Sequence, residues 1–139
     1  MKIRYCSAAL AYNASTKEML IISNKKRTAW TFPKGGLEPG ISAEENAAKE
    51  CLEESGYSCA EKGFSLGTYE IYKEGMVNRI EVFALALGRK EGDPEPGRKI
   101  VIGSPDLCCQ YLDRYLQPFV MRLEEHLEAC NDHDSRKKK

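Results

Sequence analysis

The sequence predicts one domain of the α/β (α+β) class, and three observations support this prediction. Apolar segments follow the order strand, strand, strand, helix, strands, helix. The stretch between Ser42 and Gly56 has clear helix start and stop residues. A chain of 139 residues can bury one sizeable core without disulfides. We expect the domain to occupy residues 1–130 and a disordered basic tail to follow at 131–139.

Strands are expected on both sides of this helix. The segments before it are short and dense in apolar residues, as in strands that are mostly buried. Two longer segments follow the helix, and a turn around 73–76 is expected to join them into an antiparallel hairpin. The predicted strands are 3–12, 18–23, 30–32, 64–72, 78–88 and 99–102.

Two further helices are expected near the C-terminus. Ser104 suits a helix N-cap, and Pro105 suits the first helical position. The last helix is predicted to begin at Pro118, and its apolar residues recur at the spacing of one helix face. The residues of this face, which we expect to pack on the sheet, are Phe119, Val120, Leu123, Leu127 and Cys130.

The composition favours no macromolecular partner by itself. Lys+Arg and Asp+Glu both number 21, so the chain has no general attraction to nucleic acids or membranes. The sequence has no run of 18 apolar residues, and its N-terminal segment is too interrupted for a signal peptide. The six cysteines form no C-x-x-C pair, which disfavours a zinc site. We therefore expect a cytoplasmic protein with reduced thiols and no membrane partner.

Three acids on the predicted helix are the main candidates for a chemical site. At about 100° per residue, Glu53 and Glu54 lie roughly 60° and 40° to either side of Glu50. Carboxylates this close repel one another and raise each other's pKa unless a cation lies among them. Oxygen ligands of this kind suit Mg²⁺ or Mn²⁺. The alternative is a solvated acidic face of the helix.

The ends of the same helix are well marked. Ser42 and Glu45 form a capping box, and Gly56 suits the left-handed position after the last turn. Ala48 and Leu52 lie away from the acids and are expected to pack inward. Because both ends are fixed, we expect the helix to hold the three acids in a preformed site.

The stretch 35–57 resembles the Nudix box, the signature of hydrolases that act on nucleoside diphosphates linked to another group. The box is G, five residues, E, seven residues, R-E-U-x-E-E-x-G-U, where U is a bulky apolar residue. The resemblance implies an α/β/α sandwich with a mixed sheet and a divalent metal, Mg²⁺ or Mn²⁺. It also implies that Glu50, Glu53 and Glu54 are both metal ligands and catalytic residues. The residues that match are Gly35, Glu50, Cys51, Glu53, Glu54, Gly56 and Tyr57.

Two positions of the box differ in this chain. Ile41 takes the place of the first Glu, and Lys49 takes the place of the Arg. In the family these two residues pair, and the Arg steadies the helix that carries the metal ligands. We expect Lys49 to pair with Glu45, one turn earlier, instead. The differences are therefore expected to affect positioning of the acids and not metal binding itself.

The segment 30–36, W-T-F-P-K-G-G, resembles the start of the box in Nudix branches that cleave diadenosine polyphosphates, diphosphoinositol polyphosphates and RNA 5′ ends. In those branches the main-chain carbonyl before the first box glycine is a metal ligand, which implies the Lys34 carbonyl here. The Lys34 side chain is a candidate phosphate ligand. Lys25 and Arg27, in a basic loop, are either substrate-binding or merely solvated. Tyr69 is either a stacking platform for a base or part of the core.

The resemblance implies hydrolysis of a phosphoanhydride bond by metal-activated water, with Glu53 or an acid from a later segment taking the proton. The later candidates are Glu81, Glu91 and Glu95. The predicted partner is a small phosphorylated nucleotide, with a dinucleoside polyphosphate such as diadenosine tetraphosphate as first choice. The alternatives are an RNA 5′ end, a nucleoside triphosphate, and nucleotide binding without hydrolysis. The sequence leaves a monomer and a homodimer open.

Overall fold

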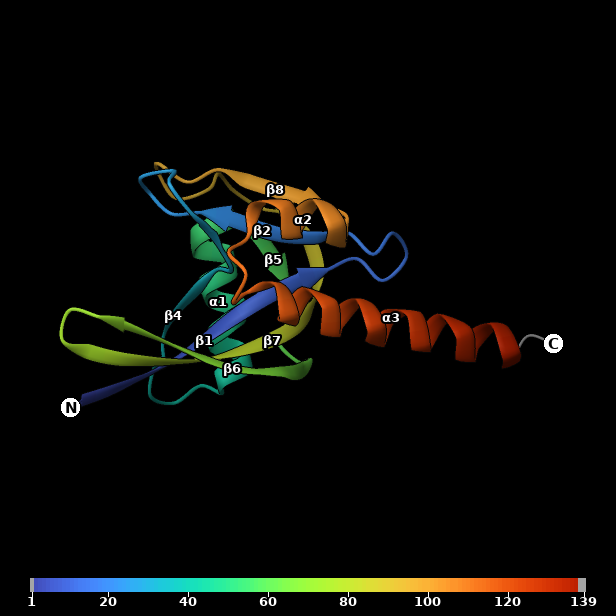
Figure 1. The fold of residues 1–139 in the computed structure, drawn as a ribbon, viewed down its shortest axis with the longest axis horizontal. Coiled ribbons are helices and arrows are strands. Elements are labelled where there is room, and N and C mark those ends of the chain that lie inside the picture. Colours follow the sequence, from blue (N-terminus) through green and yellow to red (C-terminus); the bar gives the residue numbers. More distant parts are fainter. Residues whose placement is uncertain (1, 138–139) are drawn as a thin grey trace.

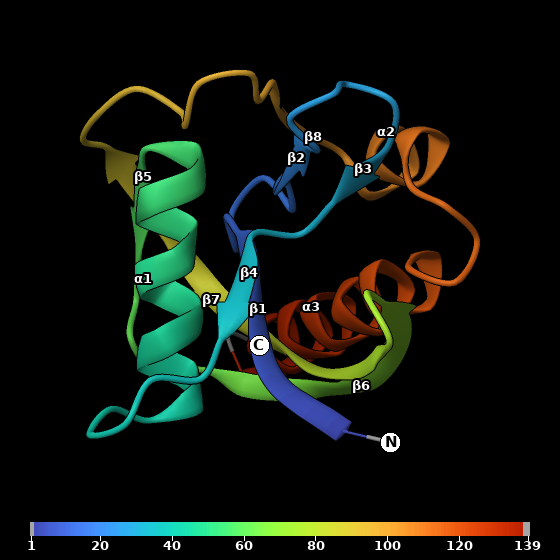
Figure 2. The same ribbon diagram turned by 90° about the vertical axis from the view of Figure 1, so that its left-hand side faces the viewer.

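A computed structural model describes the backbone of residues 2–137 and the side chains of residues 2–131. A mixed sheet lies between helix α1 on one face and helices α2 and α3 on the other (Figure 1, Figure 2). The chain therefore has the α/β fold with a mixed sheet that the sequence predicts. In order, the elements are β1 (Lys2–Tyr12), β2 (Met19–Ser23), β3 (Trp30–Thr31), β4 (Lys34–Gly36), α1 (Ala43–Ser55), β5 (Tyr57–Cys59), β6 (Phe64–Lys73), β7 (Met76–Lys90), β8 (Ile100–Gly103), α2 (Pro105–Tyr111) and α3 (Gln117–Lys137).

Strand β1 is the centre of the sheet. It pairs with β7 in parallel along its whole length and with β2 and β4 in antiparallel fashion. Strands β5 and β6 pair with β7, while β3 and β8 pair with β2, all antiparallel. Residues 8–11 of β1 are completely buried. This central strand is therefore covered on both faces, as its run of apolar residues predicts.

Successive residues of β1 contribute to two separate cores, one on each face of the sheet. Leu10 packs in the core that also contains Phe119 and Leu123 of α3. Its neighbour Ala9 packs in the opposite core, beside Cys51 of α1. Because side chains alternate along a strand, one apolar segment can support helices on both faces. The predicted packing of the last helix on the sheet is confirmed.

The predicted hairpin after α1 is also confirmed. Strands β6 and β7 pair from Phe64 opposite Ala84 to Lys73 opposite Met76. Glu74 (φ 56°) and Gly75 (φ 72°) form the turn, and both lie in the left-handed region. Two left-handed residues in a two-residue turn match the right-handed twist of the strands that they join.

Helix α1 is capped as the sequence predicts. The Ser42 hydroxyl accepts a hydrogen bond from the Glu45 N–H at 3.1 Å, and Gly56 (φ 80°) ends the helix. The expected inward packing is right for Ala48, which is buried, and wrong for Leu52, which is 41% exposed. The helix turns the side next to Cys51, and not the side of Leu52, toward the sheet.

Helix α3 is longer than expected. Its backbone is helical to Lys137, so the helix runs past residue 130, where the domain was expected to end. The disorder expected of 131–139 stays a prediction. The end of α3 projects beyond the sheet (Figure 1). Residues 138 and 139, also part of the predicted tail, lie outside the described residues. Within 2–137, no helix combines the length with the apolar composition that a membrane crossing requires.

Candidate active site

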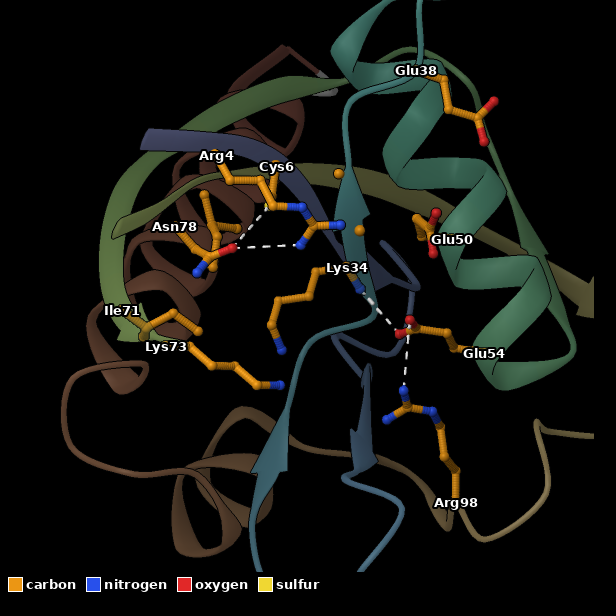
Figure 3. Close-up of a pocket in the computed structure, with 13 residues that line it drawn as sticks. Arg4, Cys6, Lys34, Glu38, Glu50, Glu54, Ile71, Lys73, Asn78 and Arg98 are labelled. Carbon is orange, nitrogen blue, oxygen red and sulfur yellow. Dashed lines mark hydrogen bonds and ion pairs between the residues drawn. The ribbon is translucent and has the colours of Figure 1, made fainter. Parts of the chain in front are cut away.

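A cavity of about 490 Å³ opens where β4 and α1 meet the centre of the sheet. Figure 3 shows the acidic side chains of α1 and its preceding loop on one side of the cavity, Arg4, Lys34 and Lys73 on the other side, and Arg98 beside Glu54. The cations come from β1, β4, β6 and the segment before β8. The cavity is lined by Arg4, Cys6, Lys34, Gly35, Gly36, Glu38, Glu50, Glu54, Ile71, Lys73, Asn78, Ile80 and Arg98.

Gly35, the first glycine of the box, lies in strand β4. Gly35 pairs with Ser7 of β1, and this pairing places β4 beside α1. Asn46, completely buried on α1, joins the helix to both strands. Its side-chain amide donates to Ser7 Oγ at 2.9 Å and to the Gly35 carbonyl at 3.4 Å. The helix, β1 and β4 are therefore connected directly under the cavity.

Glu50 lies directly against β4. A Cβ atom at Gly35 would lie 2.3 Å from the Glu50 carboxyl carbon, so only glycine leaves room for this side chain. Burial raises the pKa of Glu50 to about 7, and the neighbouring carboxylates Glu54 and Glu53 act in the same direction. Glu50 is therefore a carboxyl group whose charged form lacks sufficient compensation within the chain.

Glu54 is 8% exposed and has two partners. Its Oε1 accepts a hydrogen bond from the main-chain N–H of Lys34 at 3.1 Å, and its Oε2 lies 3.7 Å from Arg98 Nη2. Burial nevertheless raises the pKa of Glu54, although Arg98 and the Lys34 N–H act in the opposite direction. Arg98 is itself held by Glu95 Oε1 at 2.8 Å and by the Ser23 carbonyl at 3.0 Å.

Glu53 does not join the other two acids. Its carboxylate lies 3.3 Å from Lys49 Nζ, and its side chain is absent from the cavity wall. Lys49 also pairs with Glu38, and not with Glu45 as predicted, because Glu45 faces its capping partner Ser42. Within the described part of the chain no three side chains of His, Cys, Asp or Glu form a ready metal cluster. In this structure Glu53 therefore lies apart from Glu50 and Glu54, and its role as a metal ligand stays a prediction.

The residues in the cavity nevertheless fit a divalent cation. Glu50 and Glu54 are oxygen donors on one helix face, and burial raises the pKa of both. A bound cation would relieve this unfavourable burial of negative charge. The main-chain N–H of Lys34 contacts Glu54, so the carbonyl of the same residue belongs to the backbone beside these carboxylates. Oxygen-only donors of this kind are those of Mg²⁺ and Mn²⁺ sites.

A second cavity of about 550 Å³ continues the cationic wall and shares Lys34, Lys73 and Arg98 with the first. Burial lowers the pKa of Lys34, while Glu54 opposes this shift. Sequence reasoning identified Lys25 and Lys34 but missed the other cations. Lys26 belongs to the basic loop that the sequence shows. The other cations are far apart along the chain, and nothing in the sequence connects them with one another. The second cavity is lined by Asn24, Lys25, Lys26, Thr31, Lys34, Lys73 and Arg98.

Two predicted substrate ligands lie elsewhere. Arg27 donates to the Gly97 carbonyl at 3.2 Å and lines neither cavity. The ring of Tyr69 packs between Tyr115, at 5.7 Å, and Phe119, at 5.6 Å, and its hydroxyl is buried. Tyr69 therefore belongs to the core, which is the alternative that the sequence left open.

The later acids that could have joined the site also point elsewhere. Glu81 is separated from the cavity because Asn78 and Ile80 of the same strand line it, and alternate residues face opposite sides. Glu91 lines a different hollow, on the other side of α1. Glu95 pairs with Arg98 and with Lys25 Nζ, at 3.6 Å. None of the three lines either cavity.

Two relatives match a part of the chain. A Bacillus subtilis (strain 168) protein with a provisional name as an 8-oxo-dGTP diphosphatase is 38% identical over 55 residues, which are 40% of this chain and 36% of that protein. Nudix hydrolase 17, mitochondrial, from Arabidopsis thaliana is 56% identical over 39 residues, which are 28% of this chain and 21% of that protein. The matched segments thus cover well under two thirds of the length of either relative.

Solved structures match nearly the whole fold. A NUDIX hydrolase from Nitrosomonas europaea superposes with a TM-score of 0.71 at 19% identity, covering 90% of both chains. A C. elegans Ap4A hydrolase superposes with a TM-score of 0.68 at 13% identity, covering 91% of this chain and 98% of that one. The sequence also matches the NUDIX domain over residues 3–130. The chain therefore belongs to the NUDIX domain family, as its box and its fold also indicate.

Proposed function

We propose that the chain hydrolyses a phosphoanhydride bond in a nucleoside-diphosphate-linked substrate and that Mg²⁺ or Mn²⁺ is required. The observation that carries this proposal is the arrangement of one cavity, in which Glu50 and Glu54 face a wall of cationic side chains. Carboxylates bind divalent cations, and lysine and arginine bind phosphates. A cavity that combines them suits a substrate whose phosphates contact both an ion and basic side chains.

Glu50 and Glu54 would hold the ion, and the Lys34 carbonyl and Glu53 are the further ligands implied by the box. When bound, such an ion lowers the pKa of a water molecule and offsets the charge of the phosphates. Arg98 contacts Glu54, and the Lys34 ammonium lines the same cavity, so both cations would bind phosphates near the ion. Glu53 stays the predicted proton acceptor, and its contact with Lys49 would have to be released for that role.

The length of the cationic wall supports a substrate with several phosphates in a row. Lys34, Lys73 and Arg98 lie between the two cavities, and Lys25 and Lys26 continue the wall away from the acids. A dinucleoside polyphosphate such as diadenosine tetraphosphate would place successive phosphates along this wall. The C. elegans protein is named for the same class of substrate, although the likeness to it supports the fold alone.

Three other functions are compatible with the same cavity. The name of the Bacillus subtilis relative favours a nucleoside triphosphate, such as an oxidised one, as substrate. Removal of pyrophosphate from an RNA 5′ end would use the same ion and phosphate contacts. Nucleotide binding without hydrolysis is the third, since Lys49 holds Glu53 out of the cavity.

A substrate panel with Mg²⁺ separates these functions. We expect diadenosine tetraphosphate to be cleaved to mononucleotides faster than nucleoside triphosphates or 5′-triphosphorylated RNA. Faster release of pyrophosphate from a triphosphate would overturn the substrate assignment and retain the hydrolase. Thermal stabilisation by the nucleotides without any product would instead indicate a binding module.

A further inference from the structure

Lys49 connects two acids that belong to different segments of the chain. Its ammonium group pairs with Glu38, in the loop after β4, and lies 3.3 Å from Glu53 Oε1, one turn later on α1. Glu38 also lines the cavity, whereas Glu53 does not. The lysine therefore joins the loop that leaves β4 to a helix position that is a candidate metal ligand.

A second contact between β4 and α1 lies beside the Glu38–Lys49 pair. Gly35 of β4 contacts Glu50, and the paired residues Glu38 and Lys49 are close neighbours of these two in the sequence. Strand β4 supplies the candidate Lys34 carbonyl, and α1 supplies the candidate carboxylates. The two contacts thus fix the same two elements against each other, beside the place where ligands from both must meet.

The chain has no acid at position 41, where the box has Glu. Ile41 is 36% exposed and lines a hollow together with Lys49, so its side chain lies on the same side of α1 as the lysine. Glu38, three residues earlier, provides the carboxylate instead. The acid partner of residue 49 has therefore moved along the loop.

We propose that Glu38 is a positioning residue that acts through Lys49 and keeps β4 and α1 in the relative arrangement that metal binding requires. Without Glu38, the loop would lose its ionic contact with the middle of α1, and Lys49 would pair with Glu53 alone. Both changes would oppose the gathering of ligands around one ion. The expected effect of Glu38 on catalysis rests on the proposed function, whereas its expected effect on metal binding does not.

The first test compares Glu38→Gln, Lys49→Met and the double variant, with Mn²⁺ affinity measured by electron paramagnetic resonance and kcat/KM measured separately. We expect each single change to weaken Mn²⁺ binding and to lower kcat/KM by about fivefold to tenfold. Because Glu38 acts through Lys49, adding Glu38→Gln to Lys49→Met should change either quantity by less than about twofold. Multiplicative effects in the double variant would mean that Glu38 acts directly, for example as a ligand, and would overturn the proposal.

The second test supplies the acid at the position that the box uses. In the variant Glu38→Gln/Ile41→Glu, residue 41 can pair with Lys49 but cannot reach the cavity, which it does not line. We expect Mn²⁺ affinity and kcat/KM to return to within about twofold of the original chain. Failure of this rescue contradicts the proposal. The matched control is Glu61→Gln, which removes an acid from the same hollow. An effect of Glu38→Gln no larger than that of the control also contradicts it.

Two features of these tests separate a failure of the positioning proposal from a failure of the proposed function and from a failure to fold. Mn²⁺ affinity reports on positioning even if the chain hydrolyses none of the substrates, so the two proposals can fail independently. Glu38 is about half exposed, so Glu38→Gln is expected to fold, which circular dichroism checks. If that variant does not fold, Lys49→Arg and Lys49→Met provide the same comparison. The arginine should then retain Mn²⁺ affinity, and the methionine should weaken it by about fivefold to tenfold.

Discussion

The main-chain N–H of Lys34 donates a hydrogen bond of 3.1 Å to Oε1 of Glu54, and so connects strand β4 to the last acid of helix α1. The other oxygen of Glu54 faces Arg98. This carboxylate is thus held from two sides at the point where the candidate metal ligands and the cationic wall meet.

Replacing Glu54 by Gln should abolish most of the activity. The amide keeps the size of the side chain but has no charge with which to bind an ion, and we expect turnover to fall by at least about a hundredfold. Arg98 keeps Glu95 as a partner, so the fold should persist. Steady-state kinetics and circular dichroism measure the two effects, and unchanged turnover would mean that Glu54 is not a metal ligand.

A methyl group at Gly35 should displace Glu50. The added Cβ would lie 2.3 Å from the Glu50 carboxyl carbon, so Gly35→Ala forces this carboxylate out of its place. We expect turnover to fall by about tenfold or more, because small displacements of reacting groups are costly. The matched control is Gly92→Ala, since nothing lies within 4 Å of a Cβ there. Equal effects of the two substitutions would show that Glu50 needs no such contact.

Lys73 should contribute to binding of a phosphate chain and not to the chemical step. It lies on the wall common to both cavities, away from the acids of α1. Lys73→Met is expected to raise KM for diadenosine tetraphosphate by about threefold to tenfold, to leave kcat nearly unchanged, and to weaken the dependence of KM on salt. Lys90→Met, on an exposed strand end, is the control. A fall in kcat with constant KM would contradict this role.

The stability of the metal-free chain should depend on pH through Glu50. Burial raises the pKa of this carboxyl group in the folded chain to about 7, above its ordinary value of 4.5. Between these values the folded chain binds more protons than the unfolded chain, so the free energy of unfolding decreases as pH rises. In EDTA we expect Tm to fall from about pH 5 to about pH 8, and Glu50→Gln to reduce this slope. An identical slope in the variant would exclude Glu50 as its source.

The sequence identified the parts of the site that depend on local geometry. The caps at Ser42 and Gly56 and the shared helix face of Glu50 and Glu54 follow from spacing within one short stretch. Glu53 shows the limit of that reasoning. It lies about 100° around the helix from Glu54, which is far enough for one to be buried while the other meets solvent and Lys49.

The cationic wall could not be predicted in the same way. Arg4, Lys73 and Arg98 lie on three segments that meet only because β1 pairs with β7, β6 with β7, and β2 with β8. A balanced net charge gives no indication of such a concentration, since charges are counted without regard to position. Glu38 was not recognised as the partner of Lys49, because helix spacing favours Glu45, one turn earlier, whereas Glu38 meets Lys49 only through the path of the loop after β4.

Anomalous scattering from crystals grown with Mn²⁺ tests the central claim most directly. The account predicts a manganese peak at about 2.1–2.3 Å from carboxylate oxygens of Glu50 and Glu54 and from the Lys34 carbonyl. A peak elsewhere in the molecule, with both carboxylates bound only by protein groups, would contradict it.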